Sequence, residues 1–246
     1  MGKRKIKFEL LIHDLKGPLA VIETGITFLL HQVDKYGPLT AKQQKVLERT
    51  LRNAKVTQHL VNDALEVGKS TEGIINKNEF VLSEFVEETL VEIFDLIDYN
   101  TAENIKSCAS LSEVKEILSN KDIMLNIDEK IWQRKFLMDM GKMNQIFRNL
   151  LNNALKYRKK RIDLKIEDKA GSFLIFVKDD GQGIEKMYQE KIFECYFQMD
   201  KADDYCLRGH GLGLAGVMVL VEDMGGKLFL ESDVGRGAAF SVEVPL

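Results

Sequence analysis

The sequence of 246 residues contains little proline, few cysteines and no long apolar run. Only 3 prolines occur, so helices can continue without interruption over much of the chain. The 3 cysteines (Cys108, Cys195 and Cys206) are odd in number and lack metal-ligand spacing, which favours a reducing compartment and a cytoplasmic location. The longest apolar runs fall far short of the ~20 residues that span a bilayer, and no apolar core of a secretory signal is seen. We therefore expect no membrane segment in this chain.

An excess of positive charge is also missing. The 35 Lys and Arg residues stand against 38 Asp and Glu residues, giving a formal net charge of −3. This balance argues against a nucleic-acid partner, because domains that bind nucleic acid usually carry a basic stripe. Apolar residues make up 45% and charged residues 30%, which excludes a disordered or collagen-like chain. At roughly 100–200 residues per domain, the length allows one or two domains.

The N-terminal part predicts two long helices joined by a short turn. Apolar residues recur at heptad intervals over residues 3–35 and again over residues 40–67. Thr40 is placed to cap the second helix, and Gly68 is placed to end it. One such hairpin cannot bury its own apolar seam, whereas two hairpins can form a four-helix bundle. We therefore expect residues 1–68 to form a homodimer.

After a polar linker at residues 69–78, residues 79–246 predict a second, mixed domain. Residues 100–133 show no clear pattern. The remaining periodicity predicts helices over 83–97, 143–157 and 213–224, and strands over 161–167, 172–178, 227–231 and 238–244. This is an α+β fold class, in which a helical hairpin precedes a domain with helices on a mixed or antiparallel sheet.

The first motif with chemical meaning is His13-Asp14-Leu15-Lys16-Gly17-Pro18-Leu19. At about 100° per residue, His13 lies almost opposite the apolar seam of its helix and so faces water. An exposed imidazole can titrate near neutrality and act as a nucleophile. Asp14 can accept a proton from one ring nitrogen of His13, which makes the other ring nitrogen a better nucleophile. A single exposed histidine, taken alone, is more often an ordinary surface side chain.

The second motif is Asn149-Leu150-Leu151-Asn152-Asn153-Ala154-Leu155-Lys156-Tyr157. Its spacing places Asn149, Asn153 and Lys156 on one polar face of a helix. Amide oxygens can complete the shell of a magnesium ion that phosphates already hold, and a lysine can meet phosphate charge. A solvated helix face is the simpler interpretation of this motif in isolation.

Two glycine-rich motifs follow. In Asp179-Asp180-Gly181-Gln182-Gly183-Ile184, a carboxylate at a strand end can accept a hydrogen bond from an exocyclic amine such as that of adenine, and glycines let the backbone approach a flat ligand. Gly209-His210-Gly211-Leu212-Gly213-Leu214 opens a helix whose free N–H groups can bind phosphate. Residues 211–216 also fit G-x-G-x-x-G, but no strand precedes them, so a dinucleotide fold is not indicated. No P-loop motif is present.

Taken in order, these motifs resemble those of the sensor histidine kinases. The matching segments are the H box at 13–19, the N box at 149–157, the first glycine box at 179–184, the F box at Phe193 and Phe197, and the second glycine box at 209–214. The resemblance covers nearly the whole chain. It implies a hairpin for dimerisation and histidine phosphotransfer, followed by an α/β-sandwich ATP-binding domain.

The resemblance also implies ATP and magnesium as cofactors, with adenine on Asp179 and the metal on Asn153. The γ-phosphoryl group would pass to a nitrogen of His13, beside Asp14, and then to an aspartate of a response regulator. Residues 198–208 would form a lid over the nucleotide. The other residues implied in nucleotide binding are Asn149, Lys156, Tyr157, Gly181, Gly183, Ile184, Phe197, Gly209, His210, Gly211, Leu212, Gly213 and Leu214.

The sequence departs from the family pattern in two places. Gly17 stands where the family usually has Thr or Asn, four residues after the histidine, so we expect weak phosphatase activity toward the regulator. Residues 100–133 also form a longer segment than the family needs.

Two other functions stay open from the sequence. An ATP-hydrolysing clamp of the same superfamily would need a glutamate where Asn149 stands, because an amide cannot act as a base. A non-catalytic interaction module would have no use for nucleotide motifs as complete as these.

Overall fold

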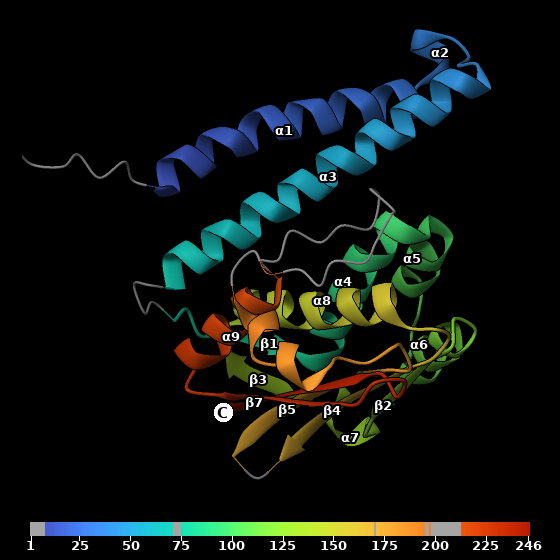
Figure 1. The fold of residues 1–246 in the computed structure, drawn as a ribbon. Coiled ribbons are helices and arrows are strands. Elements are labelled where there is room, and N and C mark those ends of the chain that lie inside the picture. The colour runs from blue at the N-terminus through green and yellow to red at the C-terminus, as the bar shows by residue number, and fades with distance from the viewer. Residues whose placement is uncertain (1–7, 71–74, 170, 195–196, 198–212) are drawn as a thin grey trace, which may run out of the picture. The chain divides into compact units, whose positions relative to one another are not determined.

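The computed structural model describes residues 8–70, 75–169, 171–194, 197 and 213–246. The chain divides into two compact units, residues 1–71 and residues 72–246, and each is described by itself. The first unit is a helical hairpin, and the second is a domain of helices packed on a sheet (Figure 1).

The hairpin consists of α1 (Phe8–His31), the single turn α2 (Val33–Tyr36) and α3 (Ala41–Ser70), with α1 and α3 packed along each other. Thr40 caps α3 reciprocally, as predicted. The backbone N–H of Gln43 donates to Thr40 Oγ1 at 3.3 Å, and the backbone N–H of Thr40 donates to Gln43 Oε1 at 2.9 Å. The prediction that Gly68 ends this helix was wrong, because α3 continues to Ser70. A glycine inside a helix costs only about 1 kcal/mol relative to alanine, so it need not terminate one.

The hairpin leaves part of its apolar seam uncovered. Ile26 on α1 and Ala54 on α3 are buried between the helices. In contrast, Leu15, Ile22 and Val33 of the same predicted seam each leave 45–48% of their surface exposed in the single chain. A lone hairpin therefore presents an apolar stripe to solvent, which is the condition that favours association into a larger bundle.

The second unit is built around a five-stranded sheet with the strand order β2-β4-β5-β7-β6. Strand β2 runs parallel to β4, and the other neighbours are antiparallel. A separate antiparallel pair joins β1 to β3. In chain order, the elements are β1 (Asn78–Val81), α4 (Leu82–Ile97), α5 (Tyr99–Lys106), α6 (Leu111–Ser119), β2 (Ile123–Ile127), α7 (Glu129–Trp132), β3 (Lys135–Met138), α8 (Met140–Tyr157), β4 (Ile162–Lys169), β5 (Ser172–Asp179), α9 (Gly213–Asp223), β6 (Lys227–Ser232) and β7 (Ala238–Pro245).

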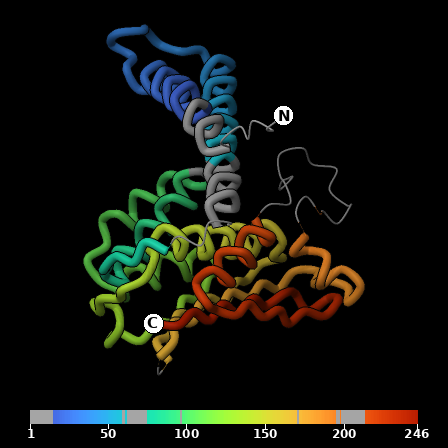
Figure 2. Tube along the Cα trace, turned by 90° about the vertical axis from the view of Figure 1, so that its left-hand side faces the viewer, coloured from blue at the N-terminus to red at the C-terminus, as the bar shows by residue number. Residues whose placement is uncertain are grey.

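One face of this sheet is covered by helices, as Figure 1 and the rotated view of Figure 2 show. Alternate residues of β4 point into the core, where Ile162, Leu164 and Ile166 are all at most 1% exposed. Aromatic rings then join the layers: Phe85 of α4 lies 5.6 Å from Phe147 of α8 and 6.3 Å from Phe173 of β5, centroid to centroid. This packing confirms the predicted α+β fold class.

The sequence missed the short elements. Strands β1 and β3 have only four residues each, too few for an alternating pattern to stand out. Residues 100–133, which gave no clear prediction, contain most of α5 together with α6, β2 and α7. The predicted linker also ends one residue late, since Asn78 already belongs to β1. Among the described helices, none is both long enough and apolar enough to cross a membrane.

A buried ion pair joins the two helices that carry the N box and the second glycine box. Lys142 Nζ of α8 lies 2.8 Å from Asp223 Oδ2 of α9, with side-chain exposures of only 6% and 15%. We expect Lys142→Met to lower the free energy of unfolding by about 3–5 kcal/mol, because it removes the ammonium group that faces a buried carboxylate. Urea unfolding measures this change.

Two controls separate this effect from surface electrostatics. Lys106→Ala breaks an exposed ion pair with Glu103 and should leave the stability almost unchanged, because solvent screens this pair. Adding Asp223→Leu to Lys142→Met should recover much of the loss, since the buried charges then disappear together. A single Lys142→Met variant as stable as the wild type would contradict the assignment.

Candidate functional site

Helix α8 presents the N-box amides at the centre of the second unit. Asp139 caps it by accepting the backbone N–H of Lys142 at 3.1 Å. Asn149 is buried at 8% exposure, and Asn153, one turn later, is half-buried. Within the described residues, Asn149 Nδ2 is a buried donor with no hydrogen-bond partner. Such an atom costs about 1–3 kcal/mol, so it points to an acceptor that arrives with a ligand.

The first turn of α9 lies beside Asn149. A Cβ built on Gly213 would stand 3.5 Å from Asn149 Oδ1, so little space separates the two helices there. The first N–H groups of a helix have no partner within it and favour a negatively charged group. The orphaned amide and the start of α9 therefore share one place, which suits a phosphate chain. Leu214 is half-buried against the core.

Asp179 closes strand β5 with a buried carboxylate. The side chain is 6% exposed, and its Oδ1 accepts the backbone N–H of Gly181 at 2.8 Å. Burial raises the pKa of Asp179 above its ordinary value of 3.8, although backbone N–H groups of Gly181 and Ala238 oppose the rise. The carboxylate can still accept further hydrogen bonds, as recognition of an exocyclic amine requires.

The first glycine box is pressed between two pieces of backbone. A Cβ on Gly181 would lie 2.2 Å from the carbonyl oxygen of Tyr157, at the end of α8. Gly183 has φ +73°, and a Cβ there would lie 2.0 Å from the carbonyl oxygen of Asp233. Both positions therefore exclude a side chain. The sequence predicted that these glycines let the backbone approach a ligand, whereas the close approach that the structure shows is to other backbone of the protein.

Sequence reasoning missed the turn between β6 and β7. Gly237 has φ +80°, and a Cβ there would lie 1.9 Å from the carbonyl oxygen of Asp179. Ser232 Oγ accepts the backbone N–H of Ile184 at 2.9 Å and donates to the carbonyl oxygen of Gly237 at 2.7 Å. This turn therefore holds both ends of the first glycine box. The Gly-x-Gly spacing of Gly235 and Gly237 was the available signal.

Asp180 ties the same box to the loop after α8. Its carboxylate accepts the backbone N–H groups of Lys159 and Lys160, each at 2.9 Å. Desolvation raises the pKa of Asp180, but the N–H groups of Lys160, Arg161 and Lys159 together outweigh it and lower the pKa below 3.8. The carboxylate therefore stays ionised and keeps the loop in place near neutral pH.

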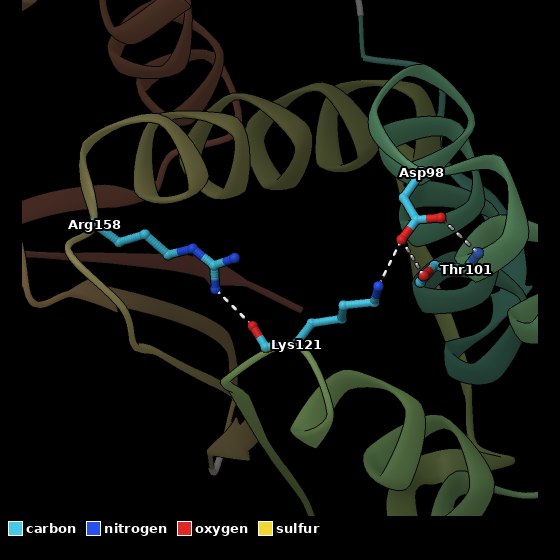
Figure 3. A network of polar contacts seen from close by, with 4 residues as sticks. All are labelled: Asp98, Thr101, Lys121 and Arg158. Atoms are coloured by element: carbon cyan, nitrogen blue, oxygen red, sulfur yellow. Dashed lines mark hydrogen bonds and ion pairs between the residues drawn. The ribbon is translucent and has the colours of Figure 1, made fainter.

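A polar network supports this loop from the other side (Figure 3). Arg158 Nη1 donates to the carbonyl oxygen of Lys121 at 2.8 Å, and Lys121 Nζ lies 2.6 Å from Asp98 Oδ2. Hydrogen bonds from Lys121 and Thr101 lower the pKa of Asp98 to about 2. The segment between α4 and β2 thus contacts the residue that directly follows the N box.

Other predicted residues lie around the same place or outside the described residues. Lys156 Nζ sits 4.8 Å from the Tyr157 ring centroid, and Phe197 packs on Tyr188 at 5.9 Å. Ile184 is buried. Gly209, His210, Gly211, Leu212 and the expected lid at 198–208 lie outside the described residues, as do the side chains of His13 and Asp14.

The side chains of α8 suit a magnesium ion that phosphate oxygens also hold. Among the described residues, no three His, Cys, Asp or Glu side chains come together as a metal site. A magnesium ion held by α8 would therefore take the Asn153 amide oxygen and depend on phosphate oxygens for the rest of its shell. The neighbouring orphaned amide of Asn149 fits a site that a ligand completes.

Comparison with known proteins agrees with this geometry. Residues 138–246 match the family described as histidine kinase-, DNA gyrase B- and HSP90-like ATPase. The circadian input-output histidine kinase CikA of Synechococcus elongatus is 29% identical over 237 residues, covering 95% of this chain and 29% of that protein. The sensor histidine kinase YkoH of Bacillus subtilis is 26% identical over 235 residues, covering 94% of this chain and 45% of that protein. The chain is thus similar to sensor histidine kinases, and its residues 138–246 match an ATPase family that these proteins share with DNA gyrase B and HSP90.

Two solved histidine kinases share the fold. Full-length ShkA in complex with AMPPNP aligns with a TM-score of 0.63 at 24% identity, over 97% of this chain and 45% of that one. The histidine kinase AdeS of Acinetobacter baumannii aligns with a TM-score of 0.53 at 17% identity, over 95% of this chain and 97% of that one. The chain thus spans less than half the length of both curated relatives and of ShkA.

Gly237→Ala should remove ATP binding, because the new Cβ would force the β6–β7 turn away from Asp179. Gly235→Ala is a matched control, since Gly235 has φ +85° but an added Cβ there meets nothing within 4 Å. Both variants carry the backbone strain of about 1–2 kcal/mol, and only Gly237→Ala adds the clash. Titration calorimetry with ATP measures affinity. Equal affinities of the two variants would contradict the role of Gly237.

As the pH is lowered, the affinity for ATP should begin to fall at a higher pH than it would if Asp179 had the pKa of an ordinary aspartate. The pKa of Asp179 is raised by burial, so its carboxylate gains a proton earlier as the pH falls. Asp179→Asn should weaken ATP binding near neutral pH by about 1.5–3 kcal/mol, the contribution of a charged hydrogen bond. The ATP affinities of the wild type and of Asp179→Asn are measured across about pH 4.5–8. Protonation of the nucleotide phosphates affects both proteins equally, so it cancels when the two profiles are compared. Parallel pH profiles, or equal wild-type affinities for ATP and GTP, would count against Asp179.

Proposed function

We propose that this protein is a histidine autokinase that transfers the γ-phosphoryl group of ATP to His13. The observation that carries the proposal is the orphaned buried amide of Asn149 beside the start of α9, in the same domain as the buried carboxylate of Asp179. These features suit the phosphate and adenine ends of ATP. The H box supplies an acceptor histidine in the sequence.

Each group would have a separate task. The carboxylate of Asp179 accepts a hydrogen bond from the exocyclic amine of adenine, and Gly181 and Gly183 keep the backbone close to the base. Lys156 and the first N–H groups of α9 meet phosphate charge. Asn153 would hold magnesium together with the phosphates, and the metal would supply charge neutralisation during transfer. A lone pair of a His13 ring nitrogen forms the N–P bond, the bond from the γ-phosphorus to its bridging oxygen breaks, and ADP leaves. Asp14 accepts the proton from the other ring nitrogen.

The phosphoryl group would then pass from His13 to an aspartate of a response regulator. The exposed apolar stripe of the hairpin supports a homodimer, because a second hairpin would bury Leu15, Ile22 and Val33 in a four-helix bundle. We place the protein in the cytoplasm because its 3 cysteines are odd in number and lack metal-ligand spacing. We also keep residues 1–68 as the dimerisation and phosphotransfer part, and residues 79–246 as the catalytic part.

Two rival functions fit the site less well. An ATP-hydrolysing clamp needs a base to activate water, and the buried amide of Asn149 cannot accept a proton near pH 7. An interaction module that binds no nucleotide would gain nothing from an unpartnered buried amide, which lowers stability.

Replacing His13 should abolish labelling without abolishing nucleotide binding. Incubation with γ-labelled ATP should give wild-type protein an acid-labile, base-stable label, and His13→Ala should give none. Titration calorimetry should show unchanged ATP affinity in His13→Ala. The matched control is His31→Ala, an exposed histidine of the same helix, which should label normally. Acid-labile label on His13→Ala would contradict the assignment, and release of phosphate without label would favour the clamp.

The phosphatase activity toward the regulator should be weak, and Gly17→Thr should raise it. Residue 17 lies one turn after His13, where a side chain could orient water toward the phospho-aspartate. A Cβ at Gly17 meets nothing within 4 Å, so the helix can accept the threonine. The measurement is the decay of a phosphorylated receiver-domain protein mixed with unphosphorylated kinase and ADP. Gly17→Ala controls for helix stiffening. Fast decay with the wild type would contradict the prediction.

A further inference from the structure

Strand β6 is the last strand at one edge of the described sheet. At its end, the carbonyl oxygen of Ser232 accepts a hydrogen bond from Gln189 Nε2 at 2.8 Å, so the free part of the edge precedes Ser232. In the described sheet order, β6 pairs only with β7. At the opposite edge, helix α6 packs against β2, and Lys115 Nζ of α6 donates to the carbonyl oxygen of Ile127 at 2.9 Å. An uncovered edge presents a row of backbone N–H and C=O groups that can pair with another strand. Phe229, in the middle of β6, is 50% exposed there.

An apolar hollow lies beside this edge. Its volume is about 270 Å³, and its lining includes Phe193, Met218 of α9, and Leu228 and Phe229 of β6. Met218 is 39% exposed, so the hollow opens to solvent. Half-exposed apolar side chains next to free backbone groups are the two features that strand addition uses, because the backbone supplies affinity and the side chains supply specificity.

The sequence of β6 is complementary to itself. Lys227, Phe229 and Glu231 alternate with inward residues, so they share the face of the sheet that points away from the core. Phe229 stands midway between the lysine and the glutamate. When two such strands run antiparallel with Phe229 opposite Phe229, each Lys227 falls opposite a Glu231. A parallel pair in register would instead place like charges opposite each other, which destabilises a sheet.

We infer that β6 is an interface for a second copy of this chain, joined edge to edge in the antiparallel register centred on Phe229. The charges favour a second copy of β6 as the partner strand. A purely basic strand would attract Glu231 but repel Lys227, and a purely acidic strand would do the reverse. The two sheets together would reach about ten strands, near the upper size of twisted open sheets. The interface lies within the second unit, so it is independent of the hairpin and of the proposed kinase activity.

A disulfide test reads the register directly. In the full chain with its 3 cysteines replaced by serine, Phe229→Cys should form a disulfide-linked dimer under mild oxidation. Directly opposite residues lie about 4.5–5.5 Å apart between Cα atoms, within reach of a disulfide. Lys227→Cys and Glu231→Cys each stand roughly 13 Å from their own copies, so each alone should link about tenfold more slowly. A mixture of these two variants should link quickly.

A charge-reversal test then asks whether complementarity is the cause. In the Phe229→Cys background, Glu231→Lys gives a strand with cations at both ends, and Lys227→Glu gives one with anions at both ends. Each should link slowly alone, whereas their mixture should recover the rate as mixed dimers, which a size tag on one copy identifies. Lys227 pairs with Glu243 of β7, so Lys227→Glu also places two glutamates opposite each other within one chain. The thermal midpoint of each charge-reversed variant must therefore match that of the Phe229→Cys parent. Glu231 pairs with Ala239, so Glu231→Lys carries no such side effect.

Four results would overturn the inference. They are no link at residue 229, equal linking at 227 and 229, no recovery in the charge-reversed mixture, and capture of an extended peptide at β6 while copies of the chain do not link. Phosphorylation of the Phe229→Cys parent by labelled ATP is measured in a separate assay. Its result does not bear on the interface, because β6 contributes no group to phosphoryl transfer.

Discussion

The close approach of three backbone segments at Asp179 is the constraint on which the rest of the site depends. The carbonyl oxygen of Asp179 lies where a side chain on Gly237 would be, and Gly181 lies equally close to the end of α8. A strand end, a helix end and a turn therefore meet with no side chain between them. This contact fixes the buried carboxylate of Asp179 relative to the end of the N-box helix.

This arrangement costs stability, and the surrounding packing offsets the cost. Because burial raises the pKa of Asp179, the folded state binds that proton more tightly than the unfolded state, so ionisation at neutral pH reduces stability. The unpartnered amide of Asn149 adds a second unfavourable term. The rings of Phe85, Phe147 and Phe173 hold the helices on the sheet around them. Both costs fall at the site, where a ligand can relieve them.

The sequence predicted the long elements well and the short ones poorly, for a physical reason. Helix α8 and strand β5 each bury one face over many residues, so their periodicity is strong. Strands β1 and β3 bury two residues or fewer each, and they are stabilised by contacts distant in the sequence, namely their mutual pairing and the packing of Phe80 and Phe136 on rings of the core. The Gly-x-Gly spacing marks Gly237 as a turn residue, but its contact with Asp179 depends on β7 lying beside β5 in space, which spacing alone does not show.

The segment between α4 and β2 contacts the loop after α8, although the two lie far apart in the sequence. Arg158, at the end of the helix, donates to the carbonyl oxygen of Lys121. On the other face of the same loop, Asp180 accepts the N–H groups of Lys159 and Lys160. The loop is thus fixed between the carbonyl oxygen of Lys121 and the carboxylate of Asp180. Because the carbonyl oxygen of Tyr157, just before this loop, lies where a side chain on Gly181 would be, the contacts that fix the loop also bear on the position of the first glycine box.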